Sequence, residues 1–395
     1  MKLRVPYYYD EFQCTAGECK DNCCVGGWEI DIDEETYEYY CNMQGEIGQK
    51  LRDNIIKNDA GEYCFKLVDG CCPMLTKEGL CLVHKELGEG YLGVVCSQFP
   101  RYSEYYGVVK ESGIGMACEE AARLMLYKNR SFSMKEEALA EEYEVDAEYD
   151  SDYATKIFRL RDFIFQLLAK EGLSIYEKLI IILSLGSDVQ EHINNGEYDK
   201  IKDVLNSYTK EYADRLLKET RAKCDNGEYD LLSLQDCMRD ILLPYEEMEV
   251  LSAEWELLLK DVINCLHEQM DKEEYGILCN EFAGYITDRE YEYRQITEYF
   301  VFRYFAKSVY DYDVLGKCQM LVTNFLVIRH MDMFRWLDNH RSYTFEDRMF
   351  IMHIFSRQVE YSEENIEQLY EDYLFDDIFK PDSLRAILWL DNDNV

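Results

Sequence analysis

The stretch FQCTAGECKDNCCVGGW, residues 12 to 28, constrains the fold more than any other part of the sequence, because it places four thiols within eleven positions. Eleven of the sixteen cysteines lie between Cys14 and Cys118, and the other five are scattered through helical-looking sequence. Loops and glycine-rich turns such as VGGW and VDGCCP accompany the early cysteines. A segment with many loops and a modest core generally needs a cross-link or a metal to hold it, and cysteine can supply either.

Whether clustered cysteines form disulfides or bind a metal depends on the cellular compartment of the protein. The first residues, MKLRVPYYYDEF, contain no apolar run of the kind that a secretory signal requires. The longest strongly apolar segment, LIIILSL, is far shorter than the roughly 20 residues that span a bilayer. We therefore expect a soluble, cytoplasmic protein, in which clustered thiols are more often metal ligands or catalytic groups than disulfides.

A second cysteine group follows the first and ends at Cys118. Thiolates suit Zn²⁺ and iron–sulfur clusters, so we predict at least one metal site among these residues. The spacings do not match the C-x₂-C pairs of a zinc ribbon, and Gly26 stands where a radical S-adenosylmethionine enzyme would need its third cysteine. His84 follows Cys81 by three residues and is a further candidate ligand, the alternative being a surface or capping group.

The composition separates the chain into parts. Residues 131–152 are dense in acidic residues and poor in large aliphatic ones, which predicts an acidic linker. Before it we predict a cysteine-rich metal-binding domain at 1–130, and after it an all-helical domain at 153–395. The predicted fold class is therefore mainly α, with a cysteine-rich metal-cluster module followed by an all-α domain.

Helix signals dominate the second part. Apolar residues recur at three- and four-residue steps from Ile157 to Leu168, which indicates an amphipathic helix. Pro381 suits the first turn of a last helix. Capping-box spacings predict three further helix starts, at Ser174 to Glu177, Thr287 to Glu290 and Thr344 to Asp347.

The charge balance limits the partners. The chain carries 42 basic and 79 acidic residues, a formal net charge of −37. This charge repels the nucleic-acid backbone and an anionic membrane surface, so we expect no nucleic-acid partner and no membrane partner. A basic protein partner fits better.

Three stretches resemble the flagellin lysine N-methylase (FliB) family: FQCTAGECKDNCCVGGWEIDIDEETYEYY, then CPMLTKEGLCLVHKELGEGYL up to FPR, then CEEAARLML. The resemblance covers residues 7 to 126, and this region is also similar to the broader group of cysteine-rich Zn/Fe-chelating (YkgJ-like) domains. One departure is CEEAAR, where the family pattern has Cys-Pro-Glu. Further on, ITEYFVFRYF, Ile296 to Phe305, resembles a tyrosine-containing helix of the family.

The resemblance implies a function and its cofactors. It implies methyl transfer from S-adenosylmethionine to surface lysines of flagellin, and a [4Fe-4S] cluster with zinc as the alternative. The implied metal ligands are drawn from eight cysteines: Cys14, Cys19, Cys23, Cys24, Cys72, Cys81, Cys96 and Cys118. The candidate residues for the cofactor pocket are Tyr299, Arg303 and Tyr304 on the matching helix, with Arg101 of FPR near the cluster; a plain salt bridge is the alternative role for Arg101.

Several alternatives stay open at this point. The chain contains no glycine-rich strand-to-helix turn like that of doubly wound methyltransferases, so the cofactor pocket must be of another kind, and no residue stands out as the catalytic base. The cluster either fixes loops around the pocket, which the excess of thiols favours, or binds the cofactor at an open iron. The protein could instead be a metal-stapled adaptor for a basic partner, or an electron-transfer protein with a reversible couple.

Overall fold

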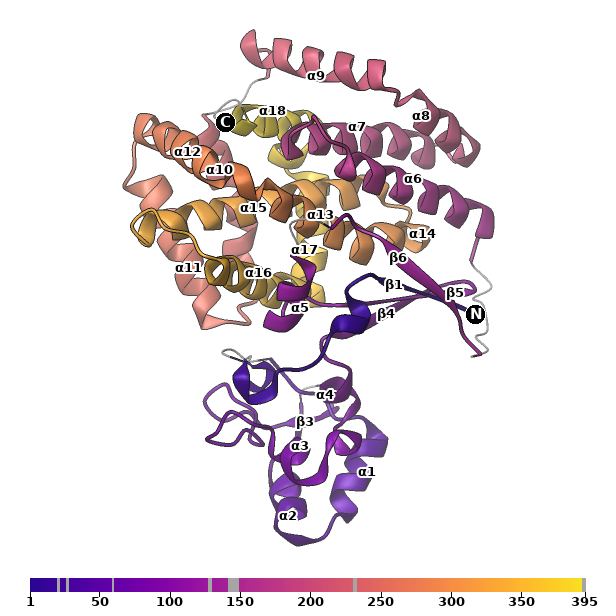
Figure 1. Cartoon of the computed structure of the whole chain (residues 1–395), viewed down its shortest axis with the longest axis vertical. Coiled ribbons are helices and arrows are strands. Elements are labelled where there is room, and N and C mark those ends of the chain that lie inside the picture. The colour runs from indigo at the N-terminus through magenta and orange to yellow at the C-terminus, as the bar shows by residue number, and fades with distance from the viewer. Residues whose placement is uncertain are drawn as a thin grey trace.

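The computed structural model of the protein describes residues 1–19, 22–25, 28–58, 60–126, 130–140, 149–229 and 233–392. Figure 1 shows two parts: a large helical body with a sheet along its lower side, and a smaller part below it. We call the smaller part, residues 13–99, the cysteine lobe, and the remainder the helical body. The described chain is mainly helical, as the sequence predicts.

The helical body is built around one central helix. α15 (Val314–Asp338) is buried along most of its length, which agrees with its mixture of apolar residues on all sides. From residue 149 onward the described chain contains helices and no strand, so the predicted all-helical part is confirmed. The other helices of the body are α5 (Glu119–Met125), α6 (Ser151–Ala169), α7 (Ile175–Asn194), α8 (Ile201–Ser207), α9 (Lys210–Asp225), α10 (Leu234–Glu247), α11 (Ala253–Ile263), α12 (Lys272–Ile286), α13 (Glu290–Tyr304), α14 (Ser308–Asp311), α16 (Phe345–Glu360), α17 (Glu363–Phe375) and α18 (Pro381–Asn392).

Two of the three predicted capping boxes are confirmed, those of Ser174 with Glu177 and Thr344 with Asp347, and Pro381 opens α18. The third predicted capping box, that of Thr287 with Glu290, was wrong. A 3₁₀ turn at Thr287–Arg289 follows α12, and the Thr287 hydroxyl donates to the Ala283 carbonyl at 3.1 Å instead of capping α13. Glu290 is thereby free to accept a hydrogen bond from the Ile175 amide at 2.6 Å, which helps to fix the start of α7.

A four-stranded sheet lies against the helices, in the order β4 (Arg101–Tyr106), β5 (Val109–Ile114), β1 (Lys2–Pro6) and β6 (Met134–Ala138). β1 runs parallel to β5 and antiparallel to β6. Strand β6 corrects the prediction of an acidic linker at 131–152, because the Glu136 carboxylate pairs with Lys2 and Arg4 of β1. Residues 141–148 of that segment lie outside the described residues.

The cysteine lobe has its own small core, formed by Ile30, Ile32, Tyr40, Leu51, Phe65, Cys72, Met74 and Val83. Its elements are α1 (Glu34–Asn42), α2 (Gly45–Asp53), β2 (Ile55–Lys57), β3 (Tyr63–Phe65), α3 (Leu82–Leu87) and α4 (Val94–Gln98). The segment predicted as one domain at 1–130 therefore divides between two cores. Tyr8, Tyr106, Ile114 and Met116 belong to the large core of the helical body, because apolar residues of β5 and α5 are buried against its helices.

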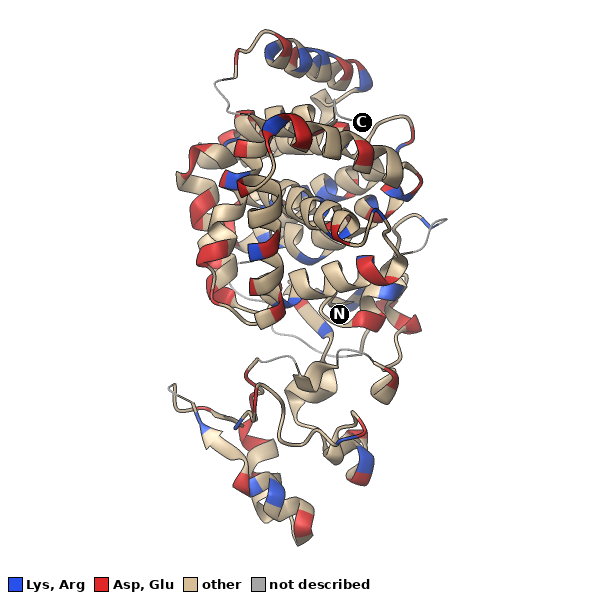
Figure 2. Cartoon of the chain, turned by 90° about the vertical axis from the view of Figure 1, so that its left-hand side faces the viewer, with Lys and Arg blue, Asp and Glu red and all other residues tan. Residues whose placement is uncertain are grey.

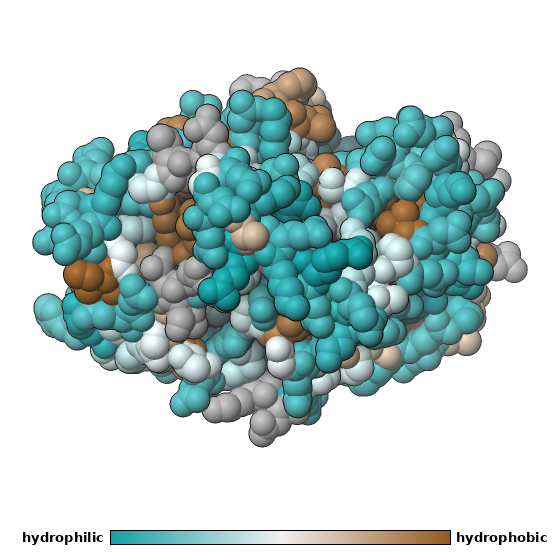
Figure 3. Space-filling model, turned by 90° about the horizontal axis from the view of Figure 1, so that it is seen from above, coloured by the Kyte–Doolittle hydropathy of each residue, from teal (hydrophilic) through white to brown (hydrophobic). Residues whose placement is uncertain are grey.

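The surface of the helical body is charged and polar. Figure 2 shows Asp and Glu positions spread along its outer helices. Seen from above, the surface is mostly hydrophilic, with hydrophobic residues in separate small areas (Figure 3). None of the described helices combines the length and the apolar character needed to cross a bilayer.

Candidate functional site

Four of the eight predicted ligand thiols meet around Cys24. Its side chain interacts with the thiols of Cys23, Cys72 and Cys81. The backbone supports this approach, because the Cys72 amide donates to the Cys24 carbonyl at 2.8 Å. Cys23 and Cys24 lie on a single 3₁₀ turn, whereas Cys81 is the N-cap of α3. The fold thus brings together two cysteine groups that are about fifty residues apart in the sequence.

Contacts within this thiol group favour ionised sulfur at Cys23, Cys72 and Cys81 but not at Cys24. The interaction with Cys24 lowers the pKa of Cys81 to about 6, and backbone N–H groups at the start of α3 act in the same direction. The same contacts lower the pKa of Cys23 and Cys72, and raise that of Cys24. Because a metal binds thiolate rather than thiol, this environment suits metal binding.

The other four predicted ligands lie around this group or beside α5. Burial raises the pKa of Cys96 to about 12, and the nearby thiols of Cys72, Cys23 and Cys81 act in the same direction. Cys19 donates to the Glu119 carboxylate at 3.3 Å, and Cys118 caps α5 close to Cys14. The structure therefore does not bring all eight thiols to one point.

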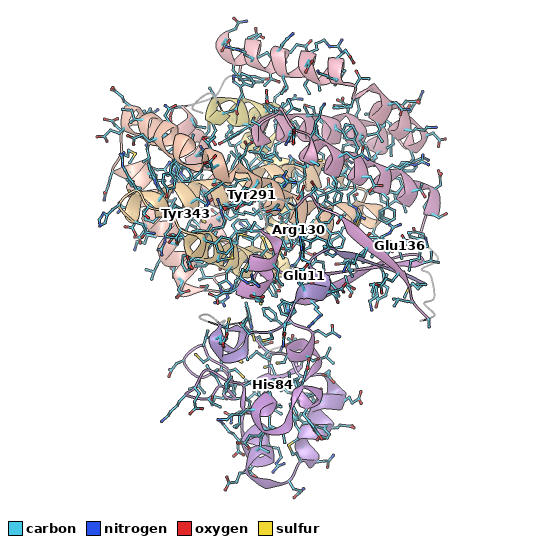
Figure 4. The ribbon with its side chains drawn as sticks, in the orientation of Figure 1. Glu11, His84, Arg130, Glu136, Tyr291 and Tyr343 are labelled. Carbon is cyan, nitrogen blue, oxygen red and sulfur yellow. The ribbon has the colours of Figure 1, made fainter. Side chains whose placement is uncertain are left out.

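Within the described residues, no group of three or more His, Cys, Asp or Glu side chains is arranged as a metal site. Cys23, Cys72 and Cys81 each interact with Cys24 and lie near one another. His84 is exposed on α3 within the lobe (Figure 4). Gly26 and Gly27 of the predicted flexible turn VGGW lie outside the described residues.

Where the lobe meets the helical body, α13 and α16 enclose a network around one carboxylate. The Glu360 side chain is 0% exposed and pairs with the Arg303 guanidinium at 3.1 Å. The hydroxyls of Tyr299 and Tyr304 both donate to the same Glu360 oxygen at 2.9 Å, and Arg303 donates to the Tyr299 oxygen at 2.6 Å. Three predicted cofactor residues are therefore in mutual contact, and the sequence prediction missed the glutamate that joins them.

Aromatic rings surround the Arg303 guanidinium. Its central carbon lies 4.4 Å from the ring centroid of Tyr102, 5.4 Å from that of Tyr304 and 5.7 Å from that of Tyr361, which are cation–π distances. Gly115 permits this packing, since a Cβ there would lie 2.8 Å from the Tyr361 hydroxyl and 2.9 Å from Arg303. The network has the composition of a cation-binding cage, and Arg303 fills it.

This network connects directly to the cysteine lobe. Trp28 of the lobe stacks on Tyr361 with ring centroids 5.4 Å apart, and the Arg357 guanidinium lies 4.8 Å from the Trp28 ring. Arg357 also lowers the pKa of Cys23 through its charge, after the larger effect of Cys24. Arg101 does not take part: it is exposed and lies over the Phe12 ring at 5.0 Å.

A cavity of about 500 Å³ opens at the other end of α13. It lies between α13, the end of α6 and the start of α7, and Figure 4 shows two of its residues, Tyr291 and Arg130, in the helical body. The sequence prediction missed this cavity, although a lysine inside the apolar run YEKLIIILSL is an unusual placement that could have pointed to it. The lining residues are Arg130, Ser131, Leu168, Ala169, Lys170, Glu171, Gly172, Leu173, Ile175, Lys178, Glu290, Tyr291 and Arg294.

Buried ionisable groups line and support the cavity. Lys178 is 7% exposed, and burial lowers its pKa. Beside the cavity, the buried Glu298 carboxylate pairs with Arg294 at 2.9 Å. Burial raises the pKa of Glu298 to about 7, although the charge of Arg294 opposes the shift.

Comparison with known proteins identifies the helical part. The model of the FliB lysine N-methylase C-terminal domain matches residues 161–390, more than half of the chain, whereas the cysteine lobe lies outside the match. Comparison with curated proteins and with solved structures gave no match. The matched range contains Tyr299, Arg303, Tyr304 and Glu360 of the network and most of the cavity lining. The chain therefore belongs to the FliB lysine N-methylase family, whose activity is the methylation of protein lysine side chains.

Proposed function

We propose that this protein transfers methyl groups from S-adenosylmethionine to the ε-amines of flagellin lysines, and that it acts in the cytoplasm. The observation that carries the proposal is the extent of the FliB match, which runs from the middle of α6 into α18. That range includes the α13–α16 network and nearly the whole cavity wall, so the matched region contains the residues best suited to bind charged ligands. The resemblance of residues 7–126 to the same family supports the proposal from the other part of the chain.

The proposed reaction sets clear demands on the site. The lone pair of a neutral lysine amine attacks the sulfonium methyl carbon, the carbon–sulfur bond breaks as the carbon–nitrogen bond forms, and S-adenosylhomocysteine leaves. The methylated ammonium product then loses its proton to a base or to solvent. A lysine-bearing partner is cationic before it reacts, and the chain's net charge of −37 favours its approach.

We also propose that the cysteine lobe holds a [4Fe-4S] cluster, with zinc as the alternative. The support for this proposal is the number of thiols, because Cys23, Cys24, Cys72 and Cys81 lie together and such a cluster uses four thiolates, although the described side chains are not arranged around a metal position. A bound cluster would cross-link the Cys23 turn to the segment from Cys72 to Cys81. We assign it a structural role: it would hold the lobe that presents Trp28 to Tyr361.

One experiment tests these proposals together. The full-length protein is purified anaerobically, analysed for iron, sulfide and zinc, and incubated with flagellin and S-adenosylmethionine before mass spectrometry of tryptic peptides. We expect iron and sulfide in similar amounts and methyl additions confined to flagellin lysines. Flagellin binding without any methyl addition would instead support the adaptor interpretation.

The ligand assignment has a matched control in the lobe. Cys24→Ser should lose most of the bound metal, whereas Cys41→Ser should keep it, because Cys41 lies on α1 beside Tyr37 and is not among the described thiols that interact with Cys24. Equal metal content in the two variants would contradict the assignment of the four thiols.

A further inference from the structure

The cavity beside α13 has the size of a cofactor site. Its volume of about 500 Å³ falls within the range of roughly 300 to 1,000 Å³ that small-molecule and cofactor sites occupy. It is formed by residues 130–131, the end of α6, residues 170–173, the start of α7 and the start of α13. None of these elements belongs to the cysteine lobe, so the cavity does not depend on a bound metal.

The lining carries charges of both signs. In a chain with a net charge of −37, four cationic residues line the cavity, Arg130, Lys170, Lys178 and Arg294, although the Arg130 guanidinium itself pairs with Glu11. Two carboxylates, Glu171 and Glu290, line the same cavity. An inorganic anion would need only the cations. The presence of both signs fits a ligand that is itself zwitterionic.

Hydrogen bonds within the protein hold several lining groups in place and leave part of their capacity unused. The Lys178 ammonium donates to the Leu168 carbonyl at 2.9 Å, which uses one of its three N–H bonds. Glu290 directs one oxygen to the Ile175 amide, and its second oxygen has no hydrogen-bond partner in the described part of the chain.

The guanidinium of Arg294 is fixed more completely. It bonds to Glu298 at 2.9 Å and to the Arg130 carbonyl at 3.0 Å. The site is therefore largely formed before any ligand arrives, which reduces the entropic cost of binding.

We infer that this cavity binds the methyl donor, S-adenosylmethionine, through its amino-acid end. Lys178 and Arg294 are suited to the ligand carboxylate, and Glu290 and Glu171 to its ammonium and sulfonium charges. Tyr291 offers an aromatic face for a flat base. This inference rests on the proposed methyl transfer and adds to it the place where the donor binds.

The inference is tested by isothermal titration of the full-length protein with S-adenosylmethionine, S-adenosylhomocysteine and inorganic phosphate. We compare the wild type with Lys178→Met and Glu290→Gln, and use Lys85→Met as the control, because Lys85 is an exposed lysine paired with Glu78 in the cysteine lobe. Loss of a charge-assisted hydrogen bond corresponds to about 10- to 100-fold weaker binding. We expect this loss in both cavity variants and wild-type affinity in the control. If Lys178→Met does not fold, the half-exposed Tyr291→Ala replaces it.

The outcomes separate this inference from the proposed function. Wild-type affinity in all the cavity variants, with methyl transfer intact, overturns the cavity assignment and leaves the methyltransferase proposal standing. Failure of the wild type to bind the donor overturns both, whereas donor binding that depends on the cavity residues without methylation of flagellin overturns only the proposed function. Phosphate binding that depends on Lys178, without donor binding, assigns the cavity to an inorganic anion and also overturns the inference.

Discussion

Arg303 and Glu360 form an ion pair of 3.1 Å that joins α13 to α16, with the carboxylate fully buried and the guanidinium nearly so. One oxygen of Glu360 accepts hydrogen bonds from Tyr299 and Tyr304 in addition to this pair. A buried charge is tolerated only when it is paired and hydrogen-bonded, so the pair and the two hydroxyls depend on one another.

Glu360→Gln should therefore be strongly destabilising. The substitution leaves the Arg303 charge without its partner, and the loss of one member of a buried ion pair costs about 3–5 kcal/mol. Urea unfolding followed by circular dichroism measures the free energy of unfolding. The control is Glu219→Gln, which breaks the exposed pair with Arg215 on α9 and should cost at most about 1 kcal/mol. Equal costs for the two variants would mean that the buried pair contributes no more than a surface pair.

Gly115→Ala should loosen the contact between the lobe and the helical body. The new Cβ would lie under 3 Å from both Tyr361 and Arg303, and overpacking of this kind costs about 1–3 kcal/mol. The measurements are the free energy of unfolding and the fluorescence of Trp28, whose stacking partner is Tyr361.

The matched control is Gly276→Ala in α12, where a Cβ meets no atom within 4 Å. That change should stabilise the protein by up to about 1 kcal/mol, because alanine favours a helix more than glycine does. A Gly115 variant as stable as wild type, with unchanged Trp28 fluorescence, would show that Tyr361 and Arg303 move aside at no cost.

Glu298 should make stability depend on pH near neutrality. Burial raises its pKa from 4.5 to about 7. The folded state then holds a proton that the unfolded state has lost between these two pH values, so the contribution to stability is present at the acidic end and is lost as the pH rises through 7. Relative to Glu298→Gln, the wild type should lose up to about 1.4 kcal/mol for each pH unit between pH 5.5 and 7, and little more above pH 8. Parallel stability curves for the two proteins over this range would contradict the assignment.

Removal of the proposed metal by an anaerobic chelator should unfold the cysteine lobe selectively. The small core around Leu51, Phe65 and Met74 is separate from the large core that surrounds α15. A lobe with so small a core relies on cross-linking, whereas the helical body does not. Hydrogen exchange followed by mass spectrometry should show faster exchange in residues 28–98 and unchanged protection in α15. Faster exchange in both would mean that the two cores unfold as one unit.

The sequence predicts well those features whose signals are local. The capping boxes at Ser174 and Thr344 need only residues three positions apart, and α18 begins at the predicted Pro381. The sheet escaped prediction because β6 has the charged sequence MKEEA, which looks like solvated chain, and because its partner β1 lies more than a hundred residues away. Such long-range pairing leaves no short-range pattern.

The residues of the candidate site likewise include some that the sequence predicts and some that it does not. The resemblance of residues 296–305 points to three members of the network, but Glu360 is a carboxylate at the end of an amphipathic helix, and only the tertiary packing reveals that it is buried. Arg101 precedes Tyr102 on β4, and successive residues of a strand point to opposite faces. Tyr102 therefore reaches Arg303 while Arg101 does not.

The position of β1 between β5 and β6 has a consequence for biosynthesis. Lys2 pairs with Val109 and with Ala138, so the central strand leaves the ribosome long before its neighbours and must wait for them. All residues of the lobe's small core have been synthesised once Val83 is added, and all thiols of the lobe have been synthesised once Cys96 is added. We therefore expect the nascent lobe to fold first and to take up the proposed metal at that stage, with the sheet and the helices assembling afterwards around the folded lobe.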